Sequence, residues 1–148
     1  DYTYDFKYVL KVNDQTITYQ GQKTTNEEYI TIEDNSYLIK DGLTYIKSED
    51  IYQIYNDNIY TNKMNLFTNG KILTNYINKG YLKDNTYLIN LKDIIYNYED
   101  NDYIEVSSNI SNNEYIINIE CKDYLNYIYK DIENADIELI YSNIVKKS

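Results

Sequence analysis

The sequence contains no histidine, tryptophan, proline or arginine, and these absences exclude several kinds of chemistry. Without histidine there is no Ser–His or Cys–His nucleophile pair, and the commonest general base and metal ligand of proteins is missing. The single cysteine, Cys121, cannot form a disulfide within the chain. We interpret it as an inert, half-buried side chain at a strand end. We therefore predict that the protein is not an enzyme, with no catalytic residues and no cofactor.

Glycine is scarce, and the four that occur stand alone at Gly21, Gly42, Gly70 and Gly80. Isolated glycines do not form a phosphate-binding loop, and a turn or a helix cap explains each of them. Nothing rich in proline or glycine divides the 148 residues, so we predict one domain over residues 1–148. No apolar run approaches the roughly 20 residues that a membrane span needs.

Tyrosine is abundant instead, with 21 residues, and isoleucine, asparagine and lysine are also frequent. All four have A/T-rich codons, which indicates an A/T-rich genome such as that of a low-GC bacterium. The composition therefore explains the tyrosines without requiring that the function uses them.

The net charge is −10, and all 14 basic residues are lysine. This charge disfavours nucleic acid as a partner, because phosphate binding needs clustered basic residues. An anionic lipid surface would also repel the chain. The charge serves solubility, or it forms an acidic face for a basic partner or a cation.

Alternating apolar residues predict antiparallel strands at both ends of the chain. At the start, turn residues separate strands over Tyr2–Val12, Thr16–Gly21, Tyr29–Glu33, Tyr37–Lys40 and Leu43–Lys47. These five form a meander, and Asp41-Gly42 is its strongest hairpin signal. Later strands are predicted over residues 81–83, 86–91, 103–108, 114–121 and 135–141.

Helical spacing interrupts the strands in three places. In the first, Ser48 is a good N-cap for a helix through SEDIYQIY. In the second, one or two short helices are expected between residues 61 and 79, with a break near Asn69-Gly70. In the third, KDYLNYIYKDI predicts a helix that ends at Glu133-Asn134. The segment LKDIIYNYED fits either a short helix or a strand.

This order predicts an α+β fold, in which a curved, half-barrel-like antiparallel sheet has a few helices covering its concave face. On the first strand Tyr4, Phe6, Tyr8 and Leu10 share one face, and Leu73, Tyr76 and Ile77 share the face of a helix. These seven residues are the candidate ligand-lining residues. The same side chains would otherwise form a tyrosine-rich core or an exposed binding platform.

Two groups of acidic residues are candidates for acid–base chemistry, and one of them for calcium binding. The first is Glu27 and Glu28, and the second is Glu99, Asp100, Asp102 and Glu105. Asn101 adds an oxygen ligand to the second group, but its spacing is not that of an EF-hand. Both groups lie in predicted loops or strand edges, where acidic side chains are ordinarily solvated, so we predict no metal site.

A resemblance follows from the order of these segments. The chain begins with a long strand, its hairpin partner and three short strands, which are YTYDFKYVLKV, QTITYQG, EYITI, SYLIK and LTYIK. Two helical segments follow, SEDIYQIY and KILTNYINKG. The chain ends with a strand, a helix and a strand, which are EYIINIE, YLNYIYKDI and ADIELIYSN. This order is similar to that of the LolA- and LppX-like lipoprotein-carrier superfamily. The resemblance implies a half-barrel with helices in its concave face and a lipid or lipidated protein as cargo. The chain lacks the N-terminal cysteine to which a lipid would be attached.

The function predicted from the sequence is a non-catalytic, extracytoplasmic binding or carrier domain. It would be the soluble part of a bacterial lipoprotein and would bind a lipid or another apolar ligand between sheet and helices. The chain does not begin with methionine, so we expect a processed or trimmed piece, anchored at the cell surface through a missing N-terminal segment. The alternative is an acidic protein-interaction module, such as an adhesion domain or an immunity-type inhibitor.

Overall fold

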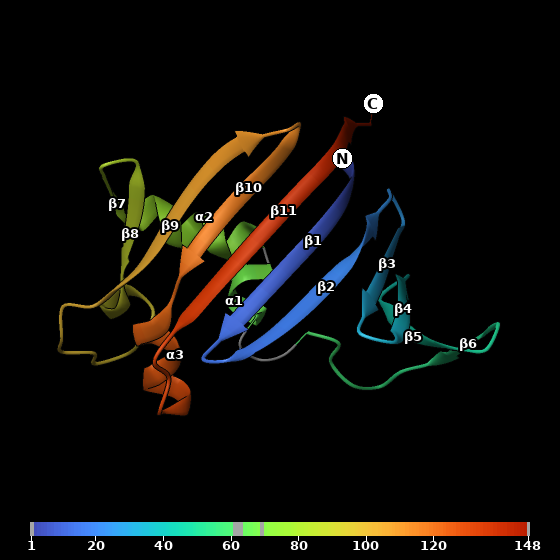
Figure 1. The fold of residues 1–148 in the computed structure, drawn as a ribbon, viewed down its shortest axis with the longest axis horizontal. Coiled ribbons are helices and arrows are strands. Elements are labelled where there is room, and N and C mark those ends of the chain that lie inside the picture. Colours follow the sequence, from blue (N-terminus) through green and yellow to red (C-terminus); the bar gives the residue numbers. More distant parts are fainter. Residues whose placement is uncertain (1, 61–63, 69, 148) are drawn as a thin grey trace.

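The structure is a computed structural model that describes residues 2–60, 64–68 and 70–147. Its strands form one antiparallel sheet of eleven strands in the order β6-β5-β4-β3-β2-β1-β11-β10-β9-β8-β7 (Figure 1). The strands are β1 (Tyr2–Val12), β2 (Gln15–Lys23), β3 (Glu27–Ile32), β4 (Asn35–Lys40), β5 (Leu43–Ser48), β6 (Ile51–Ile54), β7 (Tyr81–Lys83), β8 (Thr86–Asn90), β9 (Tyr103–Ser111), β10 (Glu114–Glu120) and β11 (Ala135–Lys146). The helices are α1 (Asn65–Thr68), α2 (Gly70–Lys79), α3 (Lys122–Tyr129) and the single 3-10 turn η1 (Leu91–Asp93).

The predicted α+β class, with helices covering a concave face, is wrong. The fold is nearly all-β, with 56% of the residues in strands and 16% in helices. In the described part of the chain three short α-helices accompany one large open sheet, too few to cover the face of eleven strands. More of the chain is strand than predicted because β9 and β11 run beyond their expected ends and because β6 was expected to be helical.

The predicted N-terminal meander is confirmed, since each of β1 to β4 pairs with its successor. At the turn between β4 and β5, Asp41 and Gly42 both have positive φ angles, of 53° and 76°. Two consecutive positive φ angles match the twist of a tight hairpin, which is why Asp-Gly is so strong a signal there.

The helix predicted from Ser48 is wrong, because residues 51–54 form β6 and pair with β5. Glu49 has a φ of 57°, a left-handed conformation that belongs to a turn and not to a helix start. Ile51 and Ile54 have the spacing of a helix, but a segment of four residues is too short to distinguish the helical repeat from the two-residue repeat of a strand.

The other helices are close to their predicted places. Those expected between residues 61 and 79 are α1 and α2, although residues 61–63 and 69 lie outside the described part. The predicted C-terminal helix is α3, but it ends at Tyr129, before Glu133-Asn134, because Lys130 and Asp131 have positive φ angles. The ambiguous segment after Leu91 contains only the turn η1.

The two ends of the chain meet at the centre of the sheet. β1 pairs with β11 from Tyr2 to Val12, with a register shift between Thr3 and Asp5, and Leu10 lies opposite Ile137 and Tyr8 opposite Leu139. These side chains lie on the inner face, which packs against Met64, Phe67 and Leu73 from the helical region behind the sheet (Figure 1). No helix in the described ranges has the length and apolar character to cross a membrane.

Candidate functional site

The inner face carries an open groove beside the core, with a volume of about 1320 Å³. It lies between the sheet strands β1 to β3 and the helices α1 and α2. Its lining consists of aromatic and small polar side chains with one acid and one base: Tyr2, Tyr4, Tyr8, Lys23, Glu28, Tyr60, Thr68, Gly70, Thr74 and Asn75. A large pocket that combines aromatic side chains with a few polar groups is the usual form of a small-molecule site.

All seven candidate ligand-lining residues belong to one hydrophobic cluster. Four of them are buried, namely Phe6, Tyr8, Leu10 and Leu73, and three are partly buried against the cluster, namely Tyr4, Tyr76 and Ile77. Of the seven, Tyr4 and Tyr8 line the groove. The wall of the groove and the core are therefore parts of one continuous aromatic layer.

Tyrosine rings form this layer through edge and stacked contacts. The Tyr4 ring lies 5.3 Å from that of Tyr141 on β11, and the Tyr8 ring lies 4.7 Å from that of Phe6 and 5.8 Å from that of Tyr141. Such pairs contribute about 0.5–1.5 kcal/mol each beyond their buried area. Burial is the largest cause of the raised pKa of Tyr8, and the neighbouring Tyr141 raises it further.

A hydrogen bond joins Glu28, the carboxylate of the groove lining, to Tyr60. The Tyr60 hydroxyl donates to Glu28 Oε1 over 3.0 Å. Burial raises the pKa of Tyr60, and the charge of Glu28 raises it further. Burial, Tyr141 and Glu28 together raise the pKa of Tyr4 to about 12. These phenols therefore remain neutral donors at physiological pH.

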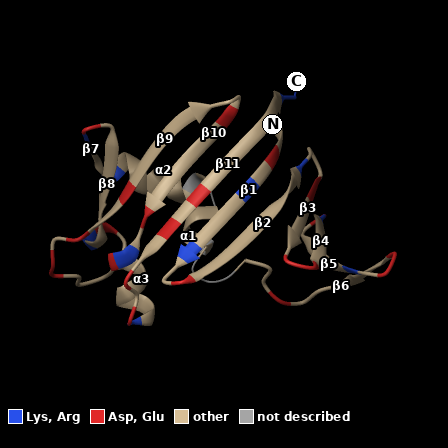
Figure 2. Ribbon diagram, viewed as in Figure 1, with Lys and Arg blue, Asp and Glu red and all other residues tan. Residues whose placement is uncertain are grey.

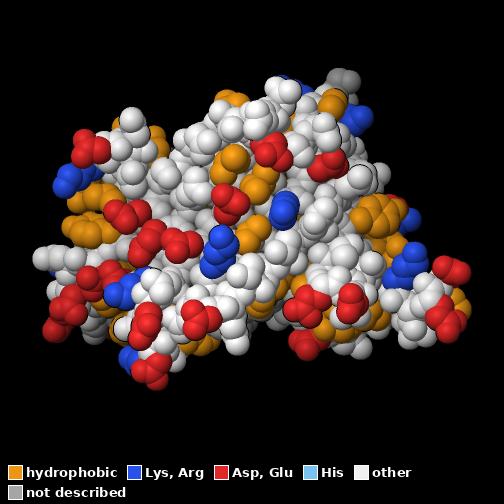
Figure 3. Space-filling model, viewed as in Figure 1, with side chains coloured by type: hydrophobic (Ala, Val, Ile, Leu, Met, Phe, Trp, Pro, Cys, Tyr) orange, Lys and Arg blue, Asp and Glu red, His pale blue; other side chains and the backbone are white. Residues whose placement is uncertain are grey.

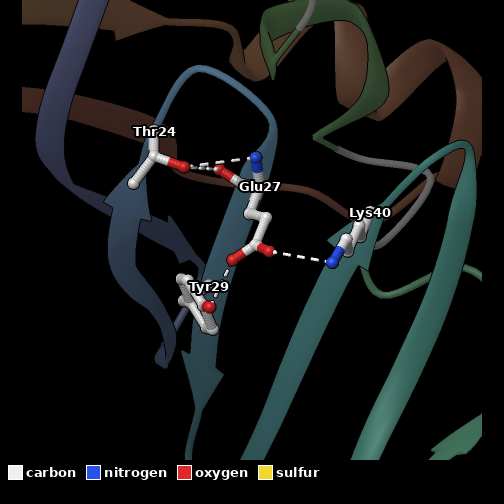
Figure 4. Close-up of polar contacts among 4 residues, drawn as sticks. All are labelled: Thr24, Glu27, Tyr29 and Lys40. Carbon is white, nitrogen blue, oxygen red and sulfur yellow. Dashed lines mark hydrogen bonds and ion pairs between the residues drawn. The ribbon is translucent and has the colours of Figure 1, made fainter.

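Glu27 and Glu28, a candidate acid–base pair, lie on opposite faces of β3. Glu27 is held on the outer face by Tyr29, whose hydroxyl donates to Glu27 Oε2, and by Lys40, whose Nζ lies 3.3 Å from Oε1 (Figure 4). These two partners lower the pKa of Glu27. Because consecutive strand residues point in opposite directions, the two carboxylates cannot act on one substrate.

Acidic side chains gather on the outer face over β9, β10 and β11, with lysines of β1 beside them (Figures 2 and 3). Glu105, Glu120 and Asp136 are cross-strand neighbours in one row, and the row continues to Lys11. Partial burial and the charges of Glu105, Asp123 and Asp136 raise the pKa of Glu120. This row borders a shallow groove of about 430 Å³.

The second acidic group is not brought together as one site. Glu99, Asp100 and Asp102 border a small groove near α3, whereas Glu105 belongs to the row on the outer face. Asp102 accepts a hydrogen bond from the Tyr98 hydroxyl. No group of three or more acidic or cysteine side chains in the described ranges is arranged to hold a metal ion.

Cys121 is more buried than expected. It is fully buried, and its thiol donates a weak hydrogen bond to the carbonyl oxygen of Ala135 over 3.7 Å. Burial raises the pKa of this thiol, and Glu120 and Asp136 raise it further. A buried, protonated thiol is unreactive.

The candidate ligand-lining residues did not include four residues that border or support the groove, namely Lys23, Glu28, Tyr60 and Tyr141. Glu28 was considered only with its neighbour Glu27. The alternation of β3, with Ile30 and Ile32 facing inward, was a sequence signal that Glu28 also faces inward. Tyr60 follows an irregular segment and has no such periodic signal.

No model of a known protein family matches the chain, and a search of curated proteins finds no significant relative. The likeness to the LolA- and LppX-like carriers therefore stays a prediction from the order of the sequence segments.

Proposed function

We propose that the protein is a non-catalytic binding domain whose inner-face groove holds a small molecule with an apolar or ring-shaped body. The groove itself carries this proposal. Its volume of about 1320 Å³ exceeds the roughly 300–1,000 Å³ of ordinary ligand pockets, so a drug-sized molecule or part of a lipid chain can lie in it.

The chemistry of the wall supports the same proposal. Tyr2 and Tyr4 offer ring surface for apolar contact, and Thr74 and Asn75 offer hydrogen-bonding groups on the opposite side. A site of this kind binds its ligand through shape and burial. An extracytoplasmic position and attachment as a lipoprotein remain predictions from the sequence.

The alternative function, an acidic module for a basic protein partner, has the row of Glu105, Glu120 and Asp136 in its favour. The same face carries Lys7 and Lys11, which offset part of the acidic charge. The inner groove is therefore the better supported site.

The binding proposal can be tested with the neutral fluorescent dye Nile red, whose emission rises in apolar surroundings. We expect saturable binding with one site per chain. Thr74→Trp places a large side chain in the groove and should weaken binding at least about tenfold. Asn78→Trp, on the same helix but outside the groove lining, is the matched control and should bind as the wild type does.

A second measurement uses the natural ligand. Organic extraction of the purified domain, followed by mass spectrometry, should release a small molecule that the Thr74→Trp variant lacks. Absence of saturable dye binding in the wild type, or equal binding by Thr74→Trp, would overturn the proposal.

A further inference from the structure

The groove contains a carboxylate without an ion-pair partner among the side chains that the structure describes. Glu28 follows the inner-face alternation of β3 and lies two residues before the buried Ile30. Its Oε1 accepts the hydrogen bond from Tyr60. Among the residues whose side chains the structure describes, the one ion pair joins Lys40 to Glu27 on the opposite face, so no lysine with a described side chain forms an ion pair with Glu28.

Tyrosine rings share the groove with this carboxylate, and the Tyr60 hydroxyl contacts it. Tyr4, Tyr8 and Tyr60 line the groove together with Glu28, and the rings of Tyr8 and Tyr60 lie 6.2 Å apart. Burial is the largest cause of the raised pKa of both Tyr4 and Tyr60, and the charge of Glu28 contributes to each. The phenols are thus neutral, and Glu28 supplies the negative charge of the groove.

A carboxylate beside several aromatic rings is the arrangement that holds organic ammonium groups, because a cation is attracted both by the charge and by the ring faces. An anionic ligand would instead be repelled by Glu28 and by the net charge of −10, although Lys23, the one base of the described lining, would attract it. Building on the binding function above, we propose that the ligand of the groove carries an organic ammonium group, held between Glu28 and the rings of Tyr4 and Tyr60.

Lys23 competes with such a ligand for the carboxylate of Glu28. It is the cross-strand partner of Glu28 and also lines the groove. Its ammonium group repels a bound cation, so replacing it with an uncharged side chain of similar length should strengthen cation binding. An anionic ligand would respond to the same replacement in the opposite direction.

The test compares choline with dimethylbutanol, its neutral carbon isostere, by nuclear magnetic resonance titration of the tyrosine ring signals. We expect choline to bind at least about tenfold more tightly than dimethylbutanol. Glu28→Gln should abolish this preference, and Lys23→Met should increase the affinity for choline about threefold or more. Circular dichroism establishes that each variant is folded.

Glu27→Gln is the matched control, because it removes the same charge from the adjacent residue on the opposite face. It should leave the preference for choline unchanged. Equal binding of the two probes, a preference that survives in Glu28→Gln, or an equal loss in Glu27→Gln would overturn the ammonium proposal. In each of these cases Nile red would still bind if the groove is a ligand site, whereas loss of dye binding counts against the binding function itself.

Discussion

Gly21 on β2 lies so close to the backbone of Tyr29 on β3 that a Cβ atom on Gly21 would stand 1.7 Å from the Tyr29 carbonyl oxygen. The same Cβ would stand 3.0 Å from the ring of Phe6. At this point β3 approaches β2 in a way that only glycine allows, and beyond it β3 to β6 turn away from the direction of the central strands (Figure 1).

Gly21→Ala should therefore be strongly destabilising. We expect a loss of at least about 3 kcal/mol in the free energy of unfolding, the upper range for overpacking, because the obstacle is backbone and not a flexible side chain. Urea denaturation followed by circular dichroism measures this loss. Gly70→Ala is the control, since a Cβ atom on Gly70 would have no neighbouring atom within 4 Å and alanine favours a helix. Equal stability of the two variants would contradict the prediction.

The hydrogen bond from Tyr60 to Glu28 should contribute measurably to stability. Tyr60→Phe keeps the ring but removes the donor, and we expect a loss of about 1.5–3 kcal/mol in the free energy of unfolding, the range for a bond to a charged group. A double-mutant cycle with Glu28→Ala, which removes the acceptor, isolates the pair. A coupling energy near zero would show that this contact is not formed in solution.

Much of the sheet could be predicted from the sequence because its hairpins are local. The alternation of residues 2–12 and the Asp41-Gly42 turn are short-range signals, and both correspond to the observed β1 and the β4–β5 hairpin. The pairing of β1 with β11 could not be predicted, because nothing in either segment specifies a partner at the other end of the chain. That pairing joins the two halves of the molecule into a single sheet, while β6 and the longer β9 and β11 leave too little helix for an α+β fold.

The site was predictable only in part for a related reason. Alternation places Tyr4 and Tyr8 on the inner face, but it does not separate a residue that fills the core from one that lines a groove. That distinction depends on Tyr60 and on residues of α1 and α2, which approach from elsewhere in the chain. Glu28 is distinguished from Glu27 as a site residue because the two side chains lie on opposite faces of β3.

Glu120 should make the protein less stable at neutral than at acidic pH. It stands directly opposite Glu105 and Asp136, and its pKa is raised in the folded state by partial burial and by these charges. The unfolded chain releases this proton first, so its contribution to stability is lost as the pH rises from the ordinary glutamate value, about 4.3, through the raised value.

Glu120→Gln should therefore stabilise the protein by about 0.5 kcal/mol at pH 7, in the range for like charges on adjacent strands, with little effect below about pH 4. Urea denaturation at several pH values measures the difference, which should shrink in high salt. Glu114→Gln is the control on the same strand, because Glu114 faces Ser111 and not an acid. A gain that is the same at acidic and neutral pH would contradict this explanation.

The edge strand β6 should be a site of aggregation. Its outer edge has no partner strand in the described sheet, and Ile51 and Ile54 are 62% and 60% exposed. An open edge with apolar side chains offers unpaired backbone groups to a strand of another molecule, and a lysine placed there is the usual protection. We expect Ile54→Lys to raise the yield of refolding and to lower light scattering at high protein concentration, with a change in stability below about 1 kcal/mol.

Ile128→Lys on α3 is the control, because Ile128 is 46% exposed but lies on a helix with no open edge. If both lysine variants reduce scattering equally, net charge and not the edge of the sheet limits solubility.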